Sequence, residues 1–498
     1  MHPTPNRLRA LAAGSALLLT VALAGCTSAA TDTEPGTSAT ARSTAAATAT
    51  ESLADHDDAS LYTWDAADEV AVTLDGTSAT VDGDGATVDG GTVTITAAGT
   101  YRLTGTLTDG QVVVETADDG VVRLVLDDAD VTSTTGAALS VTDADVVVLL
   151  LEDATSSSLT NGEGYVDPDA ATDAPNAAVY STADLTIGGT GSLTVTGRTE
   201  DGITSTDGLV VSGGTITVDA VDDGIRGKDY LVVRGESDVT VTAGGDALKA
   251  DAEAADDAVA GYVAVEAGTL TLAAGDDGVH AEGALTISGG TVDVTTSTEG
   301  LEALQVTISG GVVGVRSSDD GVNVSGGTGT ADATAQGGGR APGGGGPGGE
   351  AVLEDGWVLI SGGTTTIDAD GDGFDSNGSA TMTGGTLIVY GPTMDGNGAI
   401  DVNGTFTVDG GTLIAAGSAG MAQAPSDSSG QAFLGISFGT TVAAGSEVVV
   451  TAADGTEVVT VTPAKAAATL VVSMPGIAAG ESYDVSVDGT VLGTVTTS

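Results

Sequence analysis

The sequence predicts an all-β chain, folded as a right-handed parallel β-helix, and two repeated phrases predict it. The first phrase is an acidic residue, a glycine and an apolar residue, and most copies are separated by about 21 to 23 residues. Self-similarity at such a period is typical of a solenoid. The copies, one with alanine for glycine, are Asp201-Gly202-Ile203, Asp223-Gly224-Ile225, Asp246-Ala247-Leu248, Asp277-Gly278-Val279, Glu299-Gly300-Leu301 and Asp320-Gly321-Val322.

The second phrase is a Gly-Gly pair followed by alternating polar and apolar residues, as in Thr215-Ile216-Thr217-Val218. Alternation with a period of two is typical of a half-buried strand. A leucine-rich repeat has a similar period, but its leucine and asparagine consensus is absent. Short strands joined by turns therefore predict a β-helix whose coils lie about 4.8 Å apart. The copies are Ser212-Gly213-Gly214-Thr215, Ser288-Gly289-Gly290-Thr291, Ser309-Gly310-Gly311, Ser361-Gly362-Gly363-Thr364 and Thr383-Gly384-Gly385-Thr386.

A residue that recurs once per coil stacks into a column, so the first phrase predicts a column of carboxylates. Two such charges repel by roughly 1 kcal/mol in water and by more near a protein surface. Calcium, which takes six to eight oxygen ligands, is the cation that we expect to compensate them. Candidate metal ligands are Asp201, Asp207, Asp222, Asp223, Asp229, Asp246, Asp251, Asp276, Asp277, Glu282, Glu299 and Asp320. The alternative is that Asp-Gly is simply a favourable turn dipeptide.

The composition narrows the classes of partner. The formal charge is −57, which excludes nucleic acid, because phosphate binding needs the opposite field. Apolar residues make up 41% of the chain and alternate regularly, so a core can form despite the charge. Aromatic residues are only 3%, which predicts a core of valine, leucine, isoleucine and alanine. The single cysteine, Cys26, excludes a disulfide within the chain.

The first residues predict export and a lipid anchor. Arg7 and Arg9 precede a short apolar run that ends in Leu23-Ala24-Gly25-Cys26, which resembles a bacterial lipobox. We therefore expect a signal peptide over 1–26, lipidation of Cys26 and a disordered tether over 27–59. The expected location is extracellular, anchored through lipid to the outer face of the bacterial cell membrane. An ordinary signal peptide with a chance cysteine is the alternative.

The rest of the chain divides into three predicted parts. Residues 60–200 form an N-terminal cap and irregular coils, with strands at Val93–Thr96, Gln111–Val114, Val121–Leu126 and Val146–Leu151, the last buried on both faces. Regular coils cover 201–425, interrupted by an insertion at Glu253–Val259 and a Gly-rich insertion over 326–350, and the repeat resumes at Trp357. Residues 430–498 predict a small antiparallel β cap or sandwich.

Basic residues are few, and three of them lie among the acidic phrases: Arg226, Lys228 and Lys249. A lysine or arginine beside calcium could be the base of a polysaccharide lyase, removing the proton α to a uronate carboxylate. The alternative is that these cations neutralise surplus carboxylates. His280 follows one phrase later, but a lone histidine adds little. The sequence offers no assignable Ser/His/Asp set and no phosphate loop.

Three of these stretches resemble a bacterial family of secreted carbohydrate-binding proteins. They are Asp223-Gly224-Ile225-Arg226-Gly227-Lys228-Asp229-Tyr230-Leu231, Gly245-Asp246-Ala247-Leu248-Lys249-Ala250-Asp251 and Gly275-Asp276-Asp277-Gly278-Val279-His280-Ala281. Ala98 to Leu107 and the Val121–Leu126 strand are similar to the family's opening. The resemblance implies a fold like that of calcium-dependent pectate lyases, bound calcium, and binding to cellulose and acidic sugars. Glu299-Gly300-Leu301, with glutamate for aspartate, departs from the pattern.

The leading hypothesis is a surface-anchored, calcium-binding, non-catalytic protein that recognises cellulose or acidic pectin-like polysaccharide. Candidate carbohydrate-binding residues are Arg226, Lys228, Lys249 and Tyr230. We expect a monomer whose partners are polysaccharide and the bacterial membrane. A calcium-dependent pectate lyase acting by β-elimination and a structural adhesin are the two alternatives.

Overall fold

The computed structural model describes residues 59–162, 175–253, 261–325 and 352–497. The chain divides into two units, Met1–Thr48 and Ala49–Ser498, and all described residues lie in the second. Within the described residues, the regular elements are strands apart from two short 3-10 helices, η2 (Ala59–Tyr62) and η3 (Ala66–Asp68). They form one sheet of 35 strands and a second sheet of four. The prediction of an all-β protein is confirmed.

The N-terminal strands mix two kinds of pairing. β1 pairs antiparallel with β2 and β3 with β4, whereas β5, β7 and β9 follow β1 in parallel. The four strands predicted here are present, and β9 is buried along almost its whole length, as expected. The bounds are β1 (Glu69–Gly76), β2 (Ser78–Asp82), β3 (Ala86–Asp89), β4 (Thr92–Ile95), β5 (Gly99–Leu107), β6 (Gln111–Glu115), β7 (Val121–Thr132), β8 (Leu139–Asp143), β9 (Val146–Leu151) and β10 (Ser156–Thr160).

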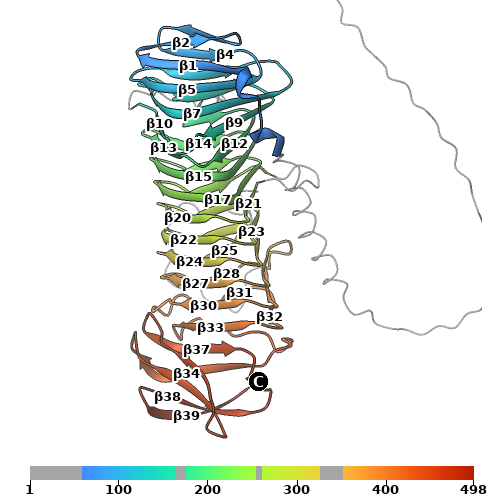
Figure 1. Cartoon of the computed structure of the whole chain (residues 1–498). Helices are drawn as coiled ribbons and strands as arrows, with labels where there is room; N and C mark the ends of the chain where they lie inside the picture. The colour runs from blue at the N-terminus through green and yellow to red at the C-terminus, as the bar shows by residue number, and fades with distance from the viewer. Residues whose placement is uncertain (1–58, 163–174, 254–260, 326–351, 498) are drawn as a thin grey trace, which may run out of the picture. The chain divides into compact units, whose positions relative to one another are not determined.

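From β11 onward the strands stack in three columns of parallel neighbours (Figure 1). The first column is β11 (Ala177–Ser181), β14 (Asp201–Ser205), β16 (Ile225–Gly227), β18 (Leu248–Ala250), β21 (Val279–Ile287), β23 (Leu301–Ile308), β25 (Val322–Val324), β28 (Phe374–Ser376) and β31 (Asp401–Val402). The second continues from β7 and β9 through β12 (Asp184–Gly189), β15 (Gly208–Ala220), β17 (Tyr230–Ala243), β19 (Tyr262–Val265), the ends of β21 and β23, β26 (Trp357–Ile360), β29 (Ser379–Met382) and β32 (Phe406–Val408). The third is β13 (Ser192–Gly197), the ends of β15 and β17, β20 (Thr269–Ala273), β22 (Thr291–Thr296), β24 (Val312–Ser317), β27 (Thr364–Ala369), β30 (Thr386–Tyr390) and β33 (Thr412–Gly417).

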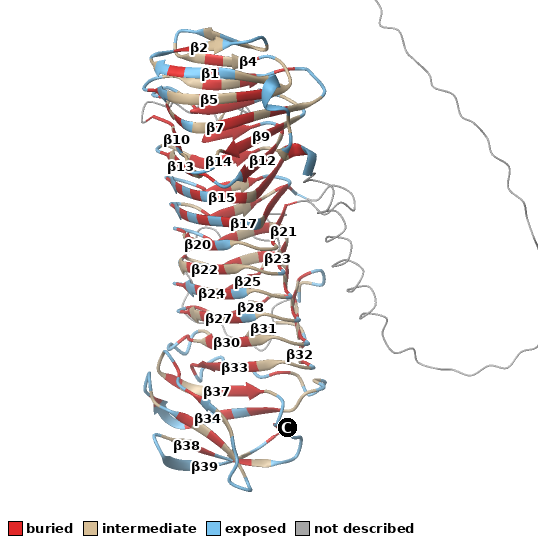
Figure 2. Cartoon of the chain, in the orientation of Figure 1, coloured by how far each residue is buried: buried red, intermediate tan, exposed pale blue. Residues whose placement is uncertain are grey.

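The Gly-Gly phrases lie between the second and third columns. The second glycine has a left-handed backbone in each copy, for example φ +88° at Gly214 and +74° at Gly290, which side-chain-bearing residues rarely adopt. The alternating residues that follow are strands, and Ile216 and Val218 point into the core while Thr215 and Thr217 are exposed. Figure 2 shows this alternation of buried and exposed residues along the strands. One apolar core runs inside the columns, from Val72 to Val471.

The C-terminal strands are antiparallel, as predicted. β37 pairs with both β33 and β34, which joins this part to the last level of the third column. A separate sheet has the order β36-β35-β38-β39. The C-terminal part has a buried core of its own, which includes Leu434 of β34, Val448 of β35 and Leu470 of β37. The bounds are β34 (Phe433–Val442), β35 (Val448–Ala452), β36 (Glu457–Val461), β37 (Ala467–Ser473), β38 (Ser482–Val487) and β39 (Thr490–Thr496).

Several sequence predictions concern residues outside the described ranges. These are the signal peptide, Cys26, the tether up to residue 58, the 326–350 insertion and most of Glu253–Val259. Trp357 pairs with Gln305 in the second column, so the repeat does resume there as expected. No helix in the described part of the chain is long and apolar enough to cross a membrane.

Candidate functional site

The acidic phrases stack at the entry to the first column. Their apolar residues pair in register from level to level, beginning with Ile203, Ile225 and Leu248, so the acids two positions earlier lie one above another. The first four acids are almost fully buried, with exposed fractions between 2% and 6%. They are Asp201, Asp223, Asp246 and Asp277. The predicted column of carboxylates is therefore present and faces away from water.

The glycine of the phrase is needed for close approach. A Cβ on Gly224 would lie 2.3 Å from Val241 Cγ1 and 2.6 Å from the carbonyl oxygen of Ala247. Its φ is outside the left-handed region, so a turn conformation does not explain it. The next residue, Ile225, is fully buried, as the sequence predicted for the apolar position. Turn chemistry alone therefore does not account for the phrase.

Three of the four buried aspartates accept a hydrogen bond from the next level along the chain. The Oδ1 atom of Asp201 accepts from the backbone nitrogen of Asp223 at 3.2 Å, and Asp223 accepts from Asp246 at 3.0 Å. Asp246 accepts from the nitrogen of Asp277 at 2.9 Å. The same contact returns between Asp320 and the nitrogen of Asp372 at 2.6 Å. We call this chain of contacts the aspartate ladder; it gives the carboxylates a structural role that the sequence did not reveal.

A second column runs beside the ladder, three residues after each acid. Its members pair in register through the first column of strands. In chain order they are Thr204, Arg226, Lys249, His280, Glu302, Asn323, Asp375 and Asp401. After Thr204, the next three members are basic, and the C-terminal four are acidic or amide. The ladder carboxylates face cations at one end and further oxygen ligands at the other.

Lys249 is the cation of the N-terminal part. Its Nζ lies 3.0 Å from Asp223 Oδ2 and 2.8 Å from Asp246 Oδ2. Burial disfavours its charged form, but the Asp246 and Asp223 carboxylates outweigh burial and raise the pKa of the ammonium. A lysine held protonated in this way neutralises carboxylates and is poorly suited to act as a base.

Arg226 is paired as well. It donates from Nε to Asp251 Oδ1 at 3.1 Å and from Nη2 to Asp251 Oδ2 at 2.6 Å. Asp251, a candidate metal ligand from the sequence, is thereby engaged by a guanidinium. Both contacts agree with the neutralising role weighed for these cations in the sequence.

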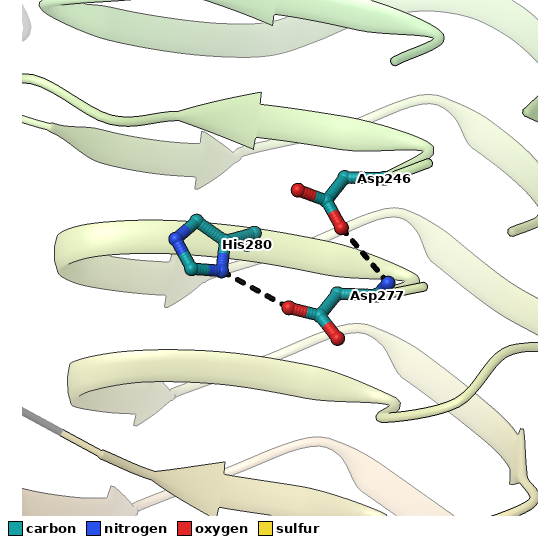
Figure 3. Close-up of side chains that lie close together, drawn as sticks. All are labelled: Asp246, Asp277 and His280. Carbon is teal, nitrogen blue, oxygen red and sulfur yellow. Dashed lines mark hydrogen bonds and ion pairs between the residues drawn. The ribbon is translucent and has the colours of Figure 1, made fainter. Parts of the chain in front are cut away.

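At the level of Asp277 the pattern changes. The Nδ1 atom of His280 lies 3.0 Å from Asp277 Oδ2 and 3.2 Å from Glu302 Oε2 (Figure 3 shows the first contact and the ladder bond from Asp246). Ligand atoms of Asp277, Glu299 and Glu302 all lie within 4.8 Å of one another, as do those of Asp246, Asp277 and His280. The glutamate phrase that departs from the family pattern is therefore where carboxylates converge.

The acids beyond this level are half-buried and crowded. Burial first, and then the Glu302 carboxylate, raise the pKa of Glu299 to about 8. Burial also raises the pKa of Asp320 to about 7, although its bond from the Asp372 nitrogen opposes the shift, and that of Asp375 to about 8, where the Asp320 carboxylate adds to it. Within the described ranges, none of these three has a lysine, arginine or histidine at ion-pair distance. Ionised, they would lack the compensation that Lys249 gives its neighbours.

Asn323 adds an oxygen with no partner at this place. It is 9% exposed, and its Nδ2 donates to Glu299 Oε2 at 2.7 Å. Its Oδ1 is buried and accepts no hydrogen bond from any described residue. A buried acceptor without a donor costs about 1–3 kcal/mol unless a donor or cation satisfies it. We call Asp277, Glu299, Glu302, Asn323, Asp320 and Asp375 together the lower acidic group.

The remaining candidates from the sequence lie elsewhere. Asp222, Asp229 and Asp276 are exposed, and Asp207 and Glu282 are half-buried. None of these five belongs to the convergent ligand groups found among the described residues. Lys228 is exposed and directly follows β16 of the first column.

Tyr230 corrects one expectation. It is only 5% exposed, its ring stacks on Tyr262 with centroids 5.6 Å apart, and its hydroxyl donates to Asp184 Oδ1 at 2.8 Å. The ring belongs to a buried cluster between neighbouring strands, so its face is covered by protein and cannot stack on a sugar.

Comparison with known proteins gives the family. The family model described as carbohydrate-binding domain-containing protein matches residues 89–339, half of the chain. A protein of that description from Acetivibrio thermocellus is 38% identical over 128 residues, which are 26% of this chain and 45% of that relative. The match thus spans less than half of the relative's length. A solved structure, described as the polysaccharide lyase-like protein from C. thermocellum in a gadolinium derivative, is 31% identical, covers 46% of this chain and 91% of its own, and has a TM-score of 0.43. The chain belongs to the carbohydrate-binding domain-containing protein family.

Proposed function

We propose that this chain is a surface-anchored, calcium-binding protein that recognises plant-type polysaccharide, cellulose or acidic pectin-like chains, without cleaving it. Membership of a carbohydrate-binding family supports polysaccharide as the partner. Calcium, the type of polysaccharide and the anchor go beyond that membership and are argued below from the residues.

The fold that we propose is a right-handed parallel β-helix with a C-terminal antiparallel β cap. The three columns of parallel strands and their level-to-level register support it. We keep the division into an N-terminal cap over 60–200, regular coils over 201–425 and a cap over 430–498. Such a scaffold repeats one side-chain position at about 4.8 Å, which is how a long row of ligands can be built from a short phrase.

Calcium would be held by the lower acidic group. The single observation that carries this is the orphan Oδ1 of Asn323, buried beside Glu299, which has no cation partner in the described ranges. Asp277 and Glu302, the other members of the convergent group, contact His280 instead. Two oxygens on opposite sides of a calcium ion lie at most about 5 Å apart, given ligand distances of about 2.3–2.6 Å. The ligand atoms of Asp277, Glu299 and Glu302 lie within 4.8 Å of one another and fit that limit. Carboxylate and amide oxygens are also the ligands that calcium prefers.

The N-terminal ladder would not need calcium. Lys249 already lies between Asp223 and Asp246, and Arg226 engages Asp251. From the sequence, all the acidic phrases were candidate calcium ligands. We now assign calcium to the lower acidic group alone. The pairing of Lys249 and Arg226 also weakens the lyase alternative for these two candidate bases, and leaves the exposed Lys228 as the third.

Calcium would serve binding as well as structure. A chain with a formal charge of −57 repels a uronate polymer, and a bound divalent ion reverses the field locally. The test is retention of the protein lacking residues 1–50 on polygalacturonate and on cellulose, with calcium and with chelator. We expect retention on polygalacturonate with calcium only. Retention on neither polymer would contradict the proposal, and attachment to cells that competing polysaccharide does not reduce would favour the adhesin.

The location remains a proposal from the first 58 residues, which the structure does not describe. Cys26, as the lipidated residue, would anchor a monomer to the outer face of the bacterial membrane. Radiolabelled fatty acid incorporation into the full chain, and its loss in Cys26→Ser, tests this step.

A further inference from the structure

A groove of about 520 Å³ crosses the second column of strands near its N-terminal end. Its floor comes from β7, β9, β12, β15 and β17, which are successive parallel neighbours. At about 4.8 Å per strand the groove extends roughly 19 Å along the stack. It lies on different strands from the lower acidic group, which β23, β25 and β28 carry or adjoin. The groove is therefore a separate and elongated site.

Two aromatic side chains form one wall of this groove. Tyr62 and Trp64 come from η2 and the loop after it, the short helix beside β9 and β12 in Figure 1. Trp64 Nε1 donates to Glu69 Oε1 at 2.6 Å, and the Tyr62 hydroxyl lies 2.7 Å from Ser212 Oγ. Arg123 Nε also donates to the carbonyl oxygen of Leu61 at 2.7 Å. These bonds fix both rings against the strands, while each side chain stays partly exposed.

Polar groups line the rest of the groove. Glu152 accepts from Arg102 Nη1 at 2.6 Å, and Asp153 accepts from Thr190 Oγ1 at 3.0 Å. Arg234 also lines it. Arg102 pairs with Glu152, and Arg234 Nη1 lies 3.9 Å from Glu266 Oε2, so the lining offers no unpaired cation to a uronate and suits a neutral ligand. Acceptors and donors beside flat rings match hydroxyl groups around an apolar sugar face.

We propose that this groove binds a neutral polysaccharide, with a pyranose face stacked on Trp64 and hydroxyls bonded to Glu152, Asp153 and Arg234. The inference rests on the proposed function and deepens it, because it assigns neutral and acidic chains to two different sites. Aromatic residues make up only 3% of the chain, and Trp64 is one of its two tryptophans. Binding at this groove needs no calcium.

The second tryptophan, Trp357, makes the test specific. In Trp357→Phe the only tryptophan is Trp64, and in Trp64→Phe it is Trp357. We would titrate cellohexaose, a soluble neutral glucan, into each protein with chelator present and follow tryptophan emission. We expect a saturable change in Trp357→Phe and none in Trp64→Phe. Calorimetry should show affinity for cellohexaose at least about tenfold weaker in Trp64→Ala, and unchanged in Trp357→Phe.

The outcomes separate the groove from the wider proposal. Cellohexaose binding that leaves the Trp64 emission unchanged would place the neutral site elsewhere and overturn the inference. So would a wild-type chain that is retained on polygalacturonate but does not bind cellohexaose, with the proposed function intact. A wild-type chain that binds neither cellohexaose nor polygalacturonate would contradict both proposals. The fluorescence assay follows Trp64 in Trp357→Phe, in which the groove residues are unchanged. The test of the groove therefore does not depend on whether Trp64→Ala folds.

Discussion

The carboxylate of Asp223 accepts a hydrogen bond from the backbone of Asp246, with 3.0 Å between Oδ1 and the nitrogen. The two residues are one level apart, and both are buried. The contact explains why an acid, or at least a short side chain with an oxygen, recurs at this phase of the repeat. It also leaves Oδ2 of each carboxylate to interact with whatever stands beside the ladder, a lysine at Asp223 and a histidine at Asp277.

The ladder predicts a difference between two substitutions of Asp223. Asp223→Asn keeps an oxygen for the Asp246 nitrogen and loses the charge opposite Lys249. Asp223→Ala loses both and leaves a buried N–H without an acceptor, which costs about 1–3 kcal/mol more. Urea unfolding of both variants measures the difference in the free energy of unfolding. Equal losses would mean that the hydrogen bond contributes nothing.

Lys249 predicts a large effect of removing one internal charge. Lys249→Met keeps the length of the side chain and leaves two buried carboxylates without their cation, so we expect a loss of about 3–5 kcal/mol. Lys228→Met is the matched control, because Lys228 is exposed and its change should stay within about 0.5 kcal/mol. The free energy of unfolding is measured in chelator. A similar effect of the two substitutions would contradict the neutralising role of Lys249.

The half-buried acids Asp320 and Asp375 predict how the stability of the metal-free protein depends on pH. The pKa of Asp320 is raised to about 7 and that of Asp375 to about 8, against about 3.9 in an unfolded chain. A folded state that holds protons more tightly than the unfolded state loses stability as the pH rises from the unfolded-state pKa to the folded-state pKa. We therefore expect a melting temperature lower by at least about 4 °C at pH 8.5 than at pH 5 in chelator.

Calcium should reverse that dependence, because a bound cation favours the ionised carboxylates. Millimolar calcium should raise the melting temperature more at pH 8.5 than at pH 5. An unchanged profile with calcium would argue that these acids hold no metal.

The glycine of the acidic phrase predicts a steric cost. Gly224→Ala would place a Cβ 2.3 Å from Val241 Cγ1, and we expect a loss of about 1–3 kcal/mol in the free energy of unfolding. Gly439→Ala is the control, since nothing lies within 4 Å of the added atom and φ is not left-handed. Thermal and urea unfolding compare the two. A tolerated Gly224→Ala would show that the levels can move apart without cost.

Spacing made much of the fold predictable. The acidic and Gly-Gly phrases repeat with the strands, so the strand positions and the inward apolar residues such as Ile225 follow from the period alone. The sequence could not show which residues share a column after an insertion. Asp277 is bonded to Asp246 across 31 residues and Asp372 to Asp320 across 52, which no fixed period predicts. For the same reason Asp375, which follows the 326–350 insertion, was not recognised as the neighbour of Asn323.

Burial explains the other differences between the sequence predictions and the structure. Tyr230 was a candidate for stacking on a sugar, with a place in the cap or core as the alternative. The second holds: it pairs with Tyr262, and the two tyrosines meet only because β17 and β19 are neighbours. The aspartates read as metal ligands because the sequence shows their phase and not their hydrogen bonds. The backbone nitrogen that each carboxylate accepts becomes visible only once the level-to-level register is known.

The most direct test is calorimetric titration of calcium into the chelator-stripped protein lacking residues 1–50. It is run on the wild-type chain, on Glu299→Gln with Glu302→Gln, and on Asp201→Asn as a ladder control outside the lower acidic group. We predict calcium binding by the wild-type chain and by Asp201→Asn, and at least about tenfold weaker binding by the double variant. A wild-type chain that binds no calcium, or a double variant that binds it as tightly as the wild type, would contradict the assignment of the lower acidic group as the calcium site.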